Sequence, residues 1–520
     1  MTVGEIITPH ALHRPNKTAI IERDRRVTYG ELEDKAGKFA GWLERQGIEP
    51  GERIALLERT SARWVVAALG ALKAGAILVP INNLLRPQEL SFILSDSEPS
   101  TLLCGEDYLG LAEEATRSGW DSLEIIALPE WDALDSFKPR DAASARAKSL
   151  TSSMTPCVFI YTAGTTGVPR AAIYSHHAFW HNLLSAVIDA FCQTYDEVWL
   201  GPVPLYHIGG LGALMRALLM SNTFLIKDRF DAEEYVYTIF KENVTILYAY
   251  PTMLNAMMGT LSRKSLNLKS LKLVIYGGSP ISLELLKQMT RRLGCHFLQR
   301  YGSTETAGGA ISVLAPQHHR MALEDPRRWG QKLESAGVPA LGVTVRLVDE
   351  SGRVIKEPGQ GGEIVARLPC PMMGYWKRDE ETREVLKDGW LYTGDIGMFD
   401  KEGFLYIVDR KKDVIISGAR NIYAREVEKT IEQHPAVQEV AVIGVPDAYW
   451  GEAVKALIVL KPGMRATESE IIDFCKQRLA SYKKPRSVEF VDSLPKNPGG
   501  KVLKRELRER YWVGMKRRVS

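Results

Sequence analysis

The sequence has little that would indicate a secreted or disulfide-stabilised protein. Its six cysteines are scattered and form no C-x-x-C pair. This pattern predicts a reducing compartment and gives no indication of a zinc site. The N-terminus (MTVGE) is polar and is not followed by the apolar segment of a secretory signal. We therefore expect a cytoplasmic protein.

Long apolar runs and a large net charge are also missing. No window approaches the roughly 18 uncharged apolar residues of a membrane-spanning helix, so we expect no transmembrane segment. The net charge of +4 is too small to indicate a nucleic-acid partner. The basic residues 516–518 leave open a weak peripheral contact with anionic lipid, although a solvated tail is the favoured interpretation. A homodimer also stays open.

The length and the order of secondary-structure signals predict several domains of the α/β class. A chain of 520 residues is too long for one hydrophobic core. Thr28 and Glu31 form a potential capping box for a helix that stops near Gly47, and residues 62–74 form a second apolar helix. Strands are expected at residues 54–57, 198–203, 223–226, 246–248 and 273–276. Alternation of this kind predicts mostly parallel sheets that are covered by helices.

The pattern changes after about residue 335. Short strands separated by Gly and Pro are expected at residues 343–348, 362–366 and 404–408, as in a small β-barrel-like subdomain. A charged run at residues 409–413 follows. Beyond it, a small α+β domain is expected, with helices at 423–433 and 467–480 and strands at 440–443 and 456–460.

The most informative segment is the Gly/Thr-rich stretch 161–170 (YTAGTTGVPR), which follows an apolar run. Glycines let backbone N–H groups approach an anion closely, and neighbouring N–H groups form an anion-binding nest. The stretch is not a Walker A loop, because Gly167 is followed by Val-Pro-Arg rather than by Lys-Ser/Thr. It therefore predicts a nucleotide-phosphate loop of another kind.

Three further motifs accompany this loop. They are residues 301–306 (YGSTET), residues 392–395 (YTGD) together with 409–413 (DRKKD), and residues 495–501 (PKNPGGK). In this order, the four motifs resemble those of the adenylate-forming superfamily, which includes acyl-CoA synthetases, peptide-synthetase adenylation domains and beetle luciferases. The resemblance runs from about Pro9 to about Leu507 and is strongest to fatty-acyl- or aryl-CoA ligases.

The resemblance implies a domain organisation. Residues 1–409 would form an N-terminal domain that binds ATP and the acyl group, with a β-rich subdomain at about 335–409. Residues 410–412 would be a hinge, with Lys412 as the hinge residue. Residues 413–520 would form a small mobile domain that carries a catalytic lysine.

The resemblance also implies a nucleotide site and one metal ion. Thr304 would donate a hydrogen bond to the α-phosphate, and Glu305 would bind Mg²⁺ together with Thr166, because hard cations take oxygen ligands. Asp395 would accept both ribose hydroxyls, and Arg410 would also reach the ribose. The residues implied to bind ATP or AMP are Thr162, Gly164, Thr165, Thr166, Gly167, Gly277, Gly278, Ser279, Tyr301, Gly302, Asp395 and Arg410.

Lys501 is implied to be the main catalytic residue. It would place a positive charge between the substrate carboxylate and the α-phosphate, with Lys496 as a weaker candidate. Ser417, Gly418 and Ala419 would contact CoA after the C-terminal domain has rotated about the hinge.

The phosphate loop departs from the family pattern at two positions. Arg170-Ala171 follows the proline where Lys-Gly is usual. Arginine keeps the charge and adds a bidentate fork, so phosphate contact is retained. Alanine adds a Cβ that restricts the backbone.

The acyl pocket is expected beside residues 204–210 (PLYHIGG). His207 occupies the position where amino-acid-activating relatives usually have an aspartate, so an α-amino acid is not the expected substrate. No basic residue stands out in the pocket segments, which disfavours a dicarboxylic acid. The residues implied to line the pocket are His207, Tyr276, Gly277, Ala307 and Gly308.

The function implied is an ATP-dependent carboxylic acid:CoA ligase with Mg²⁺. A medium- or long-chain fatty acid is the favoured substrate, and an aryl acid of the 4-coumarate type is the alternative. An acyl-AMP ligase that loads a separate carrier protein is another alternative, as is an oxygenase of the luciferase type. A non-catalytic nucleotide-binding protein would be favoured by loss of Lys501, Glu305 or Asp395, and all three are present.

Overall fold

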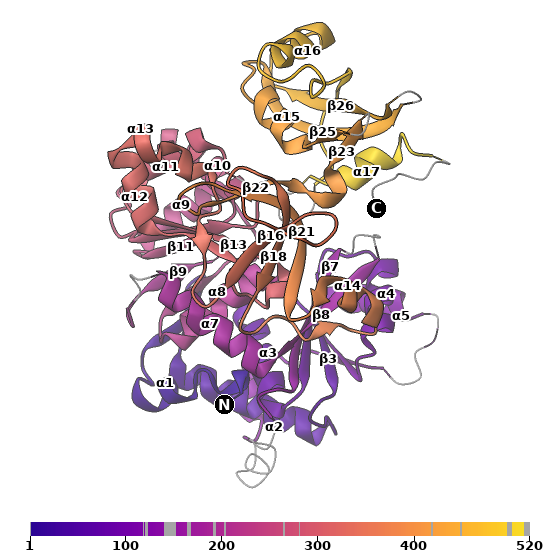
Figure 1. Cartoon of the computed structure of the whole chain (residues 1–520). Coiled ribbons are helices and arrows are strands. Elements are labelled where there is room, and N and C mark those ends of the chain that lie inside the picture. The colour runs from indigo at the N-terminus through magenta and orange to yellow at the C-terminus, as the bar shows by residue number, and fades with distance from the viewer. Residues whose placement is uncertain are drawn as a thin grey trace. The chain divides into compact units, whose positions relative to one another are not determined.

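Two compact units make up the chain. A computed structural model describes every residue except 1, 118, 120–122, 140–151, 164–167, 191–193, 202–203, 264–265, 280, 418–419, 448–449, 497–501 and 514–520. Unit 1 comprises Met1–Thr344 and Arg367–Leu391, and unit 2 comprises Val345–Ala366 and Tyr392–Ser520. The predicted α/β class, with parallel sheets first and an α+β segment last, is confirmed (Figure 1). The predicted hinge at 410–412 stays a prediction.

The first sheet of unit 1 has nine strands. Its six inner strands are parallel, and the strands at the two edges are antiparallel. The sheet order is β15 (Val338–Pro339), β14 (Ser312–Leu314), β13 (His296–Tyr301), β12 (Leu273–Gly277), β11 (Ile246–Ala249), β9 (Val198–Leu200), β10 (Thr223–Ile226), β1 (Thr18–Glu22), β2 (Arg25–Thr28).

The second sheet of unit 1 has seven strands. Five of them, β7 to β6 in the order below, are parallel, while β8 and β19 are antiparallel. The sheet order is β19 (Gly374–Tyr375), β8 (Pro169–Ser175), β7 (Pro156–Ala163), β4 (Ile77–Pro80), β3 (Arg53–Leu57), β5 (Thr101–Cys104), β6 (Glu124–Ala127).

Four helices pack against strands of both sheets in one hydrophobic core. They are α2 (Tyr29–Arg45), α3 (Ala62–Ala74), α7 (His176–Ala190) and α8 (Ile208–Leu219). Almost all of α3 is buried, which explains why its sequence is apolar on every side. The predicted capping box of α2 is confirmed, because Thr28 Oγ1 accepts from Glu31 N at 3.2 Å and Glu31 Oε2 accepts from Thr28 N at 2.7 Å.

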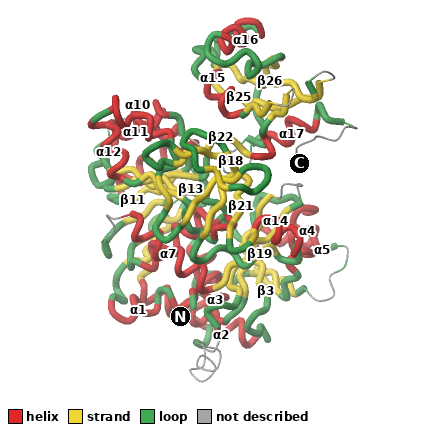
Figure 2. Tube along the Cα trace, in the orientation of Figure 1, coloured by secondary structure: helices red, strands yellow, loops and turns green. Residues whose placement is uncertain are grey.

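The other helices of unit 1 are short. The helices α4 (Pro87–Ser97) and α5 (Leu109–Thr116) cover the opposite face of the seven-stranded sheet (Figure 2). In the part of the chain that the structure describes, every helix is too short or too polar to cross a bilayer. The remaining elements of unit 1 are η1 (Val3–Glu5), α1 (Thr8–His13), η2 (Glu106–Tyr108), η3 (Ala133–Ser136), α9 (Ala232–Lys241), α10 (Pro251–Arg263), α11 (Leu283–Leu293), η4 (Thr304–Thr306), α12 (Pro316–Glu324), α13 (Pro326–Trp329), η5 (Gly330–Glu334), α14 (Asp379–Val385) and β20 (Leu386–Lys387).

A six-stranded sheet occupies the region where a β-rich subdomain was expected. Its order is β17 (Val354–Ile355), β16 (Thr344–Val348), β18 (Gly362–Arg367), β21 (Trp390–Phe399) and β20, and β22 (Leu405–Arg410) also pairs with β21. The pairs β16–β17, β20–β21 and β21–β22 are antiparallel.

The C-terminal part of unit 2 is a five-stranded sheet with helices on both faces. The helices α15 (Ala424–Ile431) and α16 (Glu468–Lys476) pack on one face, and α17 (Lys504–Glu509) packs on the other. The sheet order is β24 (Arg420–Ile422), β23 (Ile415–Ser417), β26 (Gly451–Leu460) and β25 (Val437–Asp447), with β27 (Ser487–Phe490) parallel to β26. The short helix η6 (Lys411–Asp413) precedes β23.

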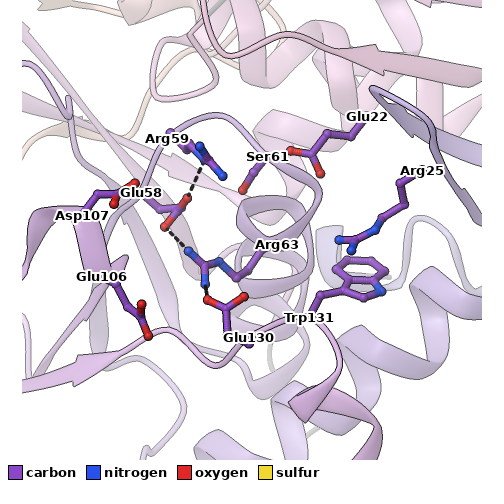
Figure 3. A pocket seen from close by; sticks show the side chains of 10 residues that line it. All are labelled: Glu22, Arg25, Glu58, Arg59, Ser61, Arg63, Glu106, Asp107, Glu130 and Trp131. Carbon is purple, nitrogen blue, oxygen red and sulfur yellow. Dashed lines mark hydrogen bonds and ion pairs between the residues drawn. The ribbon is translucent and has the colours of Figure 1, made fainter.

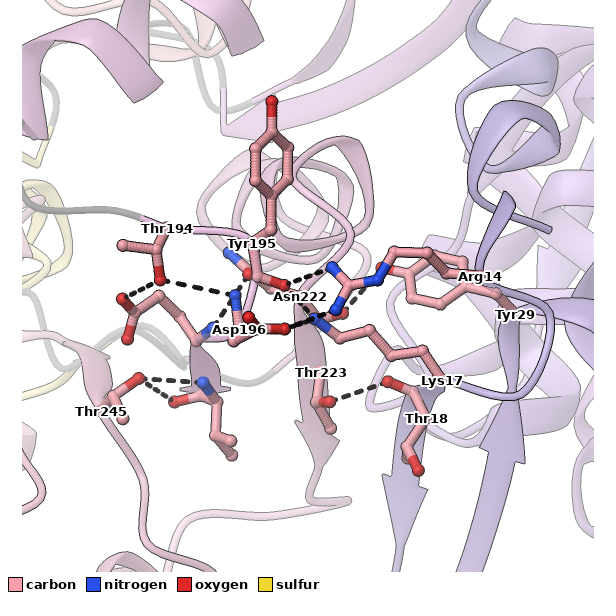
Figure 4. Close-up of polar contacts among 12 residues, drawn as sticks. Arg14, Lys17, Thr18, Tyr29, Thr194, Tyr195, Asp196, Asn222, Thr223 and Thr245 are labelled. Carbon is pink, nitrogen blue, oxygen red and sulfur yellow. Dashed lines mark hydrogen bonds and ion pairs between the residues drawn. The ribbon is translucent and has the colours of Figure 1, made fainter. Parts of the chain in front are cut away.

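Polar contacts tie the N-terminal segment to the loops that precede two inner strands of the nine-stranded sheet (Figure 4). Asp196 Oδ1 accepts from Arg14 Nη2 at 2.7 Å and from Lys17 Nζ at 2.8 Å. The buried Tyr29 hydroxyl donates to Asn222 O at 2.7 Å. These contacts fix the start of the chain against the loops that flank β9 and β10.

We predict that Asp196→Asn weakens this attachment only slightly. Hydrogen bonds from Lys17 and Arg14 lower the pKa of Asp196 to about 2, so its stabilisation is present above the ordinary pKa and disappears as the pH falls from about 4 to about 2. Because the Asp196 side chain is 73% exposed, we expect the free energy of unfolding at pH 7 to fall by less than about 1 kcal/mol. Urea denaturation at low and high salt measures the loss, which should shrink with added salt.

The exposed Glu113 on α5 offers a control, because Glu113→Gln should change neither value. A loss in Asp196→Asn above about 2 kcal/mol, or one that salt leaves unchanged, would contradict a solvent-screened ion pair.

Candidate functional site

The hairpin of β7 and β8 carries the Gly/Thr-rich stretch. Its register places the half-buried Thr162 opposite Arg170. Gly164, Thr165, Thr166 and Gly167 lie outside the described residues.

Arg170 lies among two carboxylates and an aromatic ring. Its Nη1 donates to Glu381 Oε2 at 2.9 Å, and its Nη2 lies 3.9 Å from Glu305 Oε1. The guanidinium carbon lies 3.9 Å from the centroid of the Tyr375 ring. Its Nε is buried and has no hydrogen-bond partner among the residues that the structure describes. A buried guanidinium N–H without a partner suits a phosphate oxygen.

Two tyrosines hold the segment of Thr304 and Glu305. The Tyr375 hydroxyl donates to Glu305 Oε1 at 2.6 Å, and the Tyr174 hydroxyl donates to Thr304 O at 2.6 Å. Burial, with a further contribution from the charge of Glu305, raises the pKa of both phenols. Both therefore stay protonated donors at neutral pH, and Glu305 is fixed in one orientation.

Asn182 supports the turn that follows. From α7, its Nδ2 lies 3.0 Å from Thr306 O, 3.3 Å from Ala307 O and 2.8 Å from Cys370 O. Ala307 has a φ of 51° and Gly308 a φ of 82°, so this turn has left-handed backbone at two successive residues. The amide of Asn182 thus links the carbonyls of this turn to the carbonyl of Cys370.

The beginning of α8 and the residue that follows β12 both lie close to the side chain of Tyr250. A Cβ on Gly209 would lie 2.5 Å from the Tyr250 hydroxyl, and a Cβ on Gly278 would lie 3.2 Å from Tyr250 Cδ1. A side chain at either position would crowd Tyr250, and Gly278 also has a φ of 79°, which favours glycine. The structure brings the predicted Gly278 close to the segment of His207.

His207 is the residue at the N-terminus of α8. Burial lowers its pKa to about 4, so the imidazole is neutral at physiological pH. Its ring packs on Tyr206 with the centroids 4.7 Å apart. A neutral imidazole can accept or donate a hydrogen bond at a carboxylate-binding site without adding charge.

The predicted residues of the acyl pocket are only partly brought together. Ile208, the neighbour of His207, meets Gly308, because a Cβ on Gly308 would lie 3.3 Å from Ile208 Cδ1. Tyr276 is fully buried and contacts α12, with its hydroxyl 2.9 Å from His319 Nε2. Its side chain therefore forms part of the core between β12 and α12.

Several other predicted residues lie at the ends of β12 and β13. Gly277 is the last residue of β12, and a Cβ there would lie 2.3 Å from Arg300 O. Ser279 is half-buried. Tyr301 ends β13, and a Cβ on Gly302 would lie 2.7 Å from Gly309 O.

In unit 2, the two residues predicted to bind ribose pair with each other. They face one another in the register of β21 and β22, and Arg410 Nε lies 2.6 Å from Asp395 Oδ1. Asp395 is only 4% exposed, and its N–H donates to Thr393 Oγ1 at 3.0 Å. The ion pair with Arg410 holds the buried carboxylate of Asp395 where the pairing of β21 with β22 ends.

The remaining predicted residues of unit 2 are described only in part. Lys412 lies in η6, and Ser417 ends β23 opposite Gly451. Lys496 Nζ lies 2.7 Å from Glu439 Oε1. Gly418, Ala419, Lys501 and the basic residues 516–518 lie outside the described residues.

A Mg²⁺ ion here would depend on few protein ligands. Within the described ranges, no group of three or more His, Cys, Asp and Glu residues is suited to hold a metal ion. Mg²⁺ commonly takes only one or two carboxylates together with substrate phosphates and water. The single oriented carboxylate of Glu305 fits that mode of binding.

A separate cavity of about 240 Å³ in unit 1 contains none of the predicted residues (Figure 3). Its three arginines already have partners within the lining. Arg63 donates to Glu58 Oε2 at 3.0 Å and also pairs with Glu130, and Arg25 lies over the Trp131 ring at 4.8 Å. We therefore do not identify this cavity as the functional site.

Comparisons with known proteins match nearly the whole chain. A family model of AMP-binding enzymes matches residues 8–376, and a model of the AMP-binding enzyme C-terminal domain matches residues 426–501. The chain is 34% identical over 529 residues to a fatty acid–[acyl-carrier-protein] ligase of Streptomyces coeruleorubidus, covering 100% of this chain and 98% of the relative.

The names of two further relatives refer to CoA rather than to a carrier protein. One is a feruloyl-CoA synthase of Amycolatopsis, 35% identical over 498 residues with 96% of each chain covered. Another is a long-chain-fatty-acid–CoA ligase of Mycobacterium tuberculosis, 35% identical over 513 residues with 98% of each covered. Among solved structures, an anthranilate CoA ligase in complex with anthranoyl-AMP matches with a TM-score of 0.87 and 28% identity, over 98% of this chain and 97% of that one.

We predict that Asn182→Leu destabilises unit 1. Leucine has a similar volume but no donor, so the carbonyls of Thr306, Ala307 and Cys370 lose a buried partner. The free energy of unfolding should fall by about 1–3 kcal/mol in denaturant titrations. Asn255→Leu on the exposed side of α10 is the matched control and should have little effect. Equal stability of the two variants would show that the amide is dispensable.

Proposed function

The chain belongs to the AMP-binding enzyme family and is an AMP-forming acid–thiol ligase, and from this premise we propose that it joins an organic acid to CoA through an acyl-AMP intermediate. The observation that carries the proposal is the group of Arg170, Tyr375 and Glu305 at the β7–β8 hairpin. It presents a half-buried cation and an oriented carboxylate next to the predicted phosphate loop in the sequence.

The first half-reaction joins two anions. A carboxylate oxygen attacks the α-phosphorus of ATP, the new P–O bond forms, and the bond to pyrophosphate breaks. Repulsion between the anions opposes this step, so the site needs cations and N–H donors where negative charge develops. One such donor is worth about 3–4 kcal/mol in the transition state. In our proposal, Arg170 and the N–H groups of residues 162–167 bind the β- and γ-phosphates.

Glu305 is the proposed protein ligand of Mg²⁺, with Thr166 as a second ligand. The ion, when bound, would neutralise phosphate charge. Tyr375 holds the carboxylate of Glu305 in place by its 2.6 Å hydrogen bond. Thr304 is proposed to donate to the α-phosphate, with its backbone fixed through Tyr174.

The ribose and the adenine would contact different segments. Asp395 accepts the ribose hydroxyls in our proposal, oriented by its ion pair with Arg410. The backbone of Gly277, Gly278 and Ser279 would lie against the adenine, where the absence of side chains leaves room for a flat ring.

Lys501 is the proposed catalytic lysine of the first half-reaction. In the second half-reaction, the thiol sulfur of CoA attacks the acyl carbon, and AMP leaves with the bridging oxygen. The C-terminal segment would rotate about Lys412 between the two steps, and Ser417, Gly418 and Ala419 would contact CoA. Such closure and opening commonly limits turnover.

The acid is proposed to be a medium- or long-chain fatty acid. The fatty-acid ligases among the relatives and the apolar contact of Ile208 with Gly308 support this choice. A neutral His207 would face the carboxylate end of the acyl group. An aryl acid is the second candidate, favoured by the feruloyl-CoA and anthranilate–CoA relatives.

CoA is the proposed acceptor, and a carrier protein is the second candidate because one relative is an acyl-carrier-protein ligase. Purified enzyme should release pyrophosphate when it is given ATP, Mg²⁺ and a suitable member of a panel of fatty and aryl acids. Mass spectrometry should then detect an acyl-CoA once CoA is added. Pyrophosphate release without thioester formation would favour the carrier protein, and no release with any acid would refute the proposal.

We predict that Lys501→Ala abolishes adenylation but spares thioester formation. Without the lysine, the repulsion between carboxylate and α-phosphate is no longer offset, so pyrophosphate release should fall at least about 100-fold. Supplied acyl-AMP should still react with CoA at nearly the normal rate. Lys496→Ala is the matched control on the same motif and should have the smaller effect. Normal adenylation by Lys501→Ala would contradict its assigned role.

Tyr375→Phe should weaken the metal site without removing a ligand. The substitution deletes the donor to Glu305 Oε1 and keeps the ring beneath Arg170. We expect the Mg²⁺ concentration for half-maximal pyrophosphate release to rise about tenfold or more. Tyr237→Phe on the exposed face of α9 should leave this concentration unchanged. A lower maximal rate with an unchanged Mg²⁺ requirement would argue against Tyr375 as the residue that positions Glu305.

A further inference from the structure

A cluster of buried charges lies next to the backbone of Gly308 in unit 1. It consists of Arg216 on α8, Arg300 on β13 and Asp189 near the end of α7, next to Tyr248 on β11. Arg216 is 4%, Arg300 8% and Asp189 5% exposed. Three charged side chains at this depth are unusual, because a charge is seldom buried without a partner.

The hydrogen bonds of this cluster are incomplete. Arg216 Nε donates to Gly212 O at 2.9 Å, and its guanidinium carbon lies 5.5 Å from the centroid of the Tyr248 ring. Arg300 Nη2 makes only a 3.5 Å contact with Gly308 O. Among the described residues, Arg300 Nη1 and Asp189 Oδ2 are buried without any hydrogen-bond partner. Native proteins seldom leave such atoms unsatisfied unless another group occupies the space.

The charges of the cluster do not balance. Two guanidinium groups face one carboxylate, which leaves one excess positive charge in the interior. Burial lowers the pKa of both arginines, that of Arg216 to about 10 with repulsion from Arg300 adding to the effect. Burial also raises the pKa of Asp189, although Arg300 opposes that change. A water molecule could satisfy N–H groups here but would leave the excess charge.

The cluster adjoins the segments that we propose to contact the acyl group. Arg300 contacts the carbonyl of Gly308, and Gly308 meets Ile208 at the beginning of the same helix that carries Arg216. Arg300 also directly precedes Tyr301 and the residues of the nucleotide site. These contacts place the cluster next to the segments that are proposed to line the acyl pocket.

We propose that Arg300 and Arg216 bind a second carboxylate on the acyl group, so that the substrate is a dicarboxylic acid. A carboxylate is acceptor-only and matches the planar fork of a guanidinium, so it satisfies Arg300 Nη1. With it bound, the cluster holds two cations and two anions and is neutral. The inference rests on the proposed function and keeps its reaction, but it replaces the monocarboxylic fatty acid favoured there with a dicarboxylic acid. The sequence expectation against a dicarboxylic acid considered only the segments beside the acyl pocket, which include neither Arg216 nor Arg300.

The experiment compares acids in matched pairs with the wild-type enzyme, ATP and Mg²⁺. Each pair has the same carbon number and ends in either a methyl group or a carboxylate: hexanoate and adipate, octanoate and suberate, decanoate and sebacate, with 4-methylbenzoate and benzene-1,4-dicarboxylate as the aryl pair. The best dicarboxylate should exceed its partner in kcat/KM for pyrophosphate release by about 100-fold or more, because a buried polar site rejects a substrate that leaves it unpaired.

Arg300→Gln supplies the second arm. It should lower kcat/KM for the best dicarboxylate at least about tenfold, while the matched monocarboxylate keeps or gains activity, since the buried charge is gone. Arg291→Gln, on the exposed side of α11, is the matched control and should leave both values unchanged. If Arg300→Gln does not fold, the wild-type ratios of kcat/KM between dicarboxylate and monocarboxylate test the proposal without it.

The outcomes separate this inference from the function on which it rests. Activity with monocarboxylates alone, or an equal loss for both acids in a folded Arg300→Gln enzyme, would overturn the second-carboxylate site and leave the ligase activity standing. If no acid releases pyrophosphate, both proposals fail.

Discussion

The hydrogen bond from Tyr375 to Glu305 is the contact on which the site of unit 1 depends. Tyr375 lies on β19, which pairs with the strand that carries Arg170, so a single ring reaches both charged groups. The hydroxyl donates a hydrogen bond to Oε1 of Glu305, and the ring packs against the guanidinium of Arg170. Arg170 and Glu305 thereby stay 3.9 Å apart and do not close into a tight ion pair. The Arg170 guanidinium can therefore still bind phosphate, and the Glu305 carboxylate can still bind a metal ion.

Steric limits explain the glycines around this site. Gly209 and Gly278 both lie against the side chain of Tyr250, and Gly277 faces the carbonyl of Arg300, where a Cβ would lie 2.3 Å away. Strand ends and a helix N-terminus can approach each other closely only where side chains are absent. The glycine-rich motifs are therefore a condition for packing as well as for ligand binding.

Local signals were sufficient to predict many elements. The helix at 62–74 and the strand at 223–226 have the predicted bounds, because each is a continuous apolar run with clear ends. Partners that are distant in sequence could not be predicted. Asn182 and Tyr375 act through groups far along the chain, and Tyr276 gave no sign that its hydroxyl would meet His319. Arg216 did leave a signal, as a lone charge within an otherwise apolar helix.

The C-terminal sheet shields both of its faces with helices of its own segment. Side chains that alternate along β25 enter two separate cores, Val440 and Val442 with α15 and α16, and Ala441 and Ile443 with α17. The segment thus buries its apolar surface against its own helices. Reorienting it would then require changes at only a few backbone torsions, and the energetic barrier would lie in surface contacts rather than in unfolding.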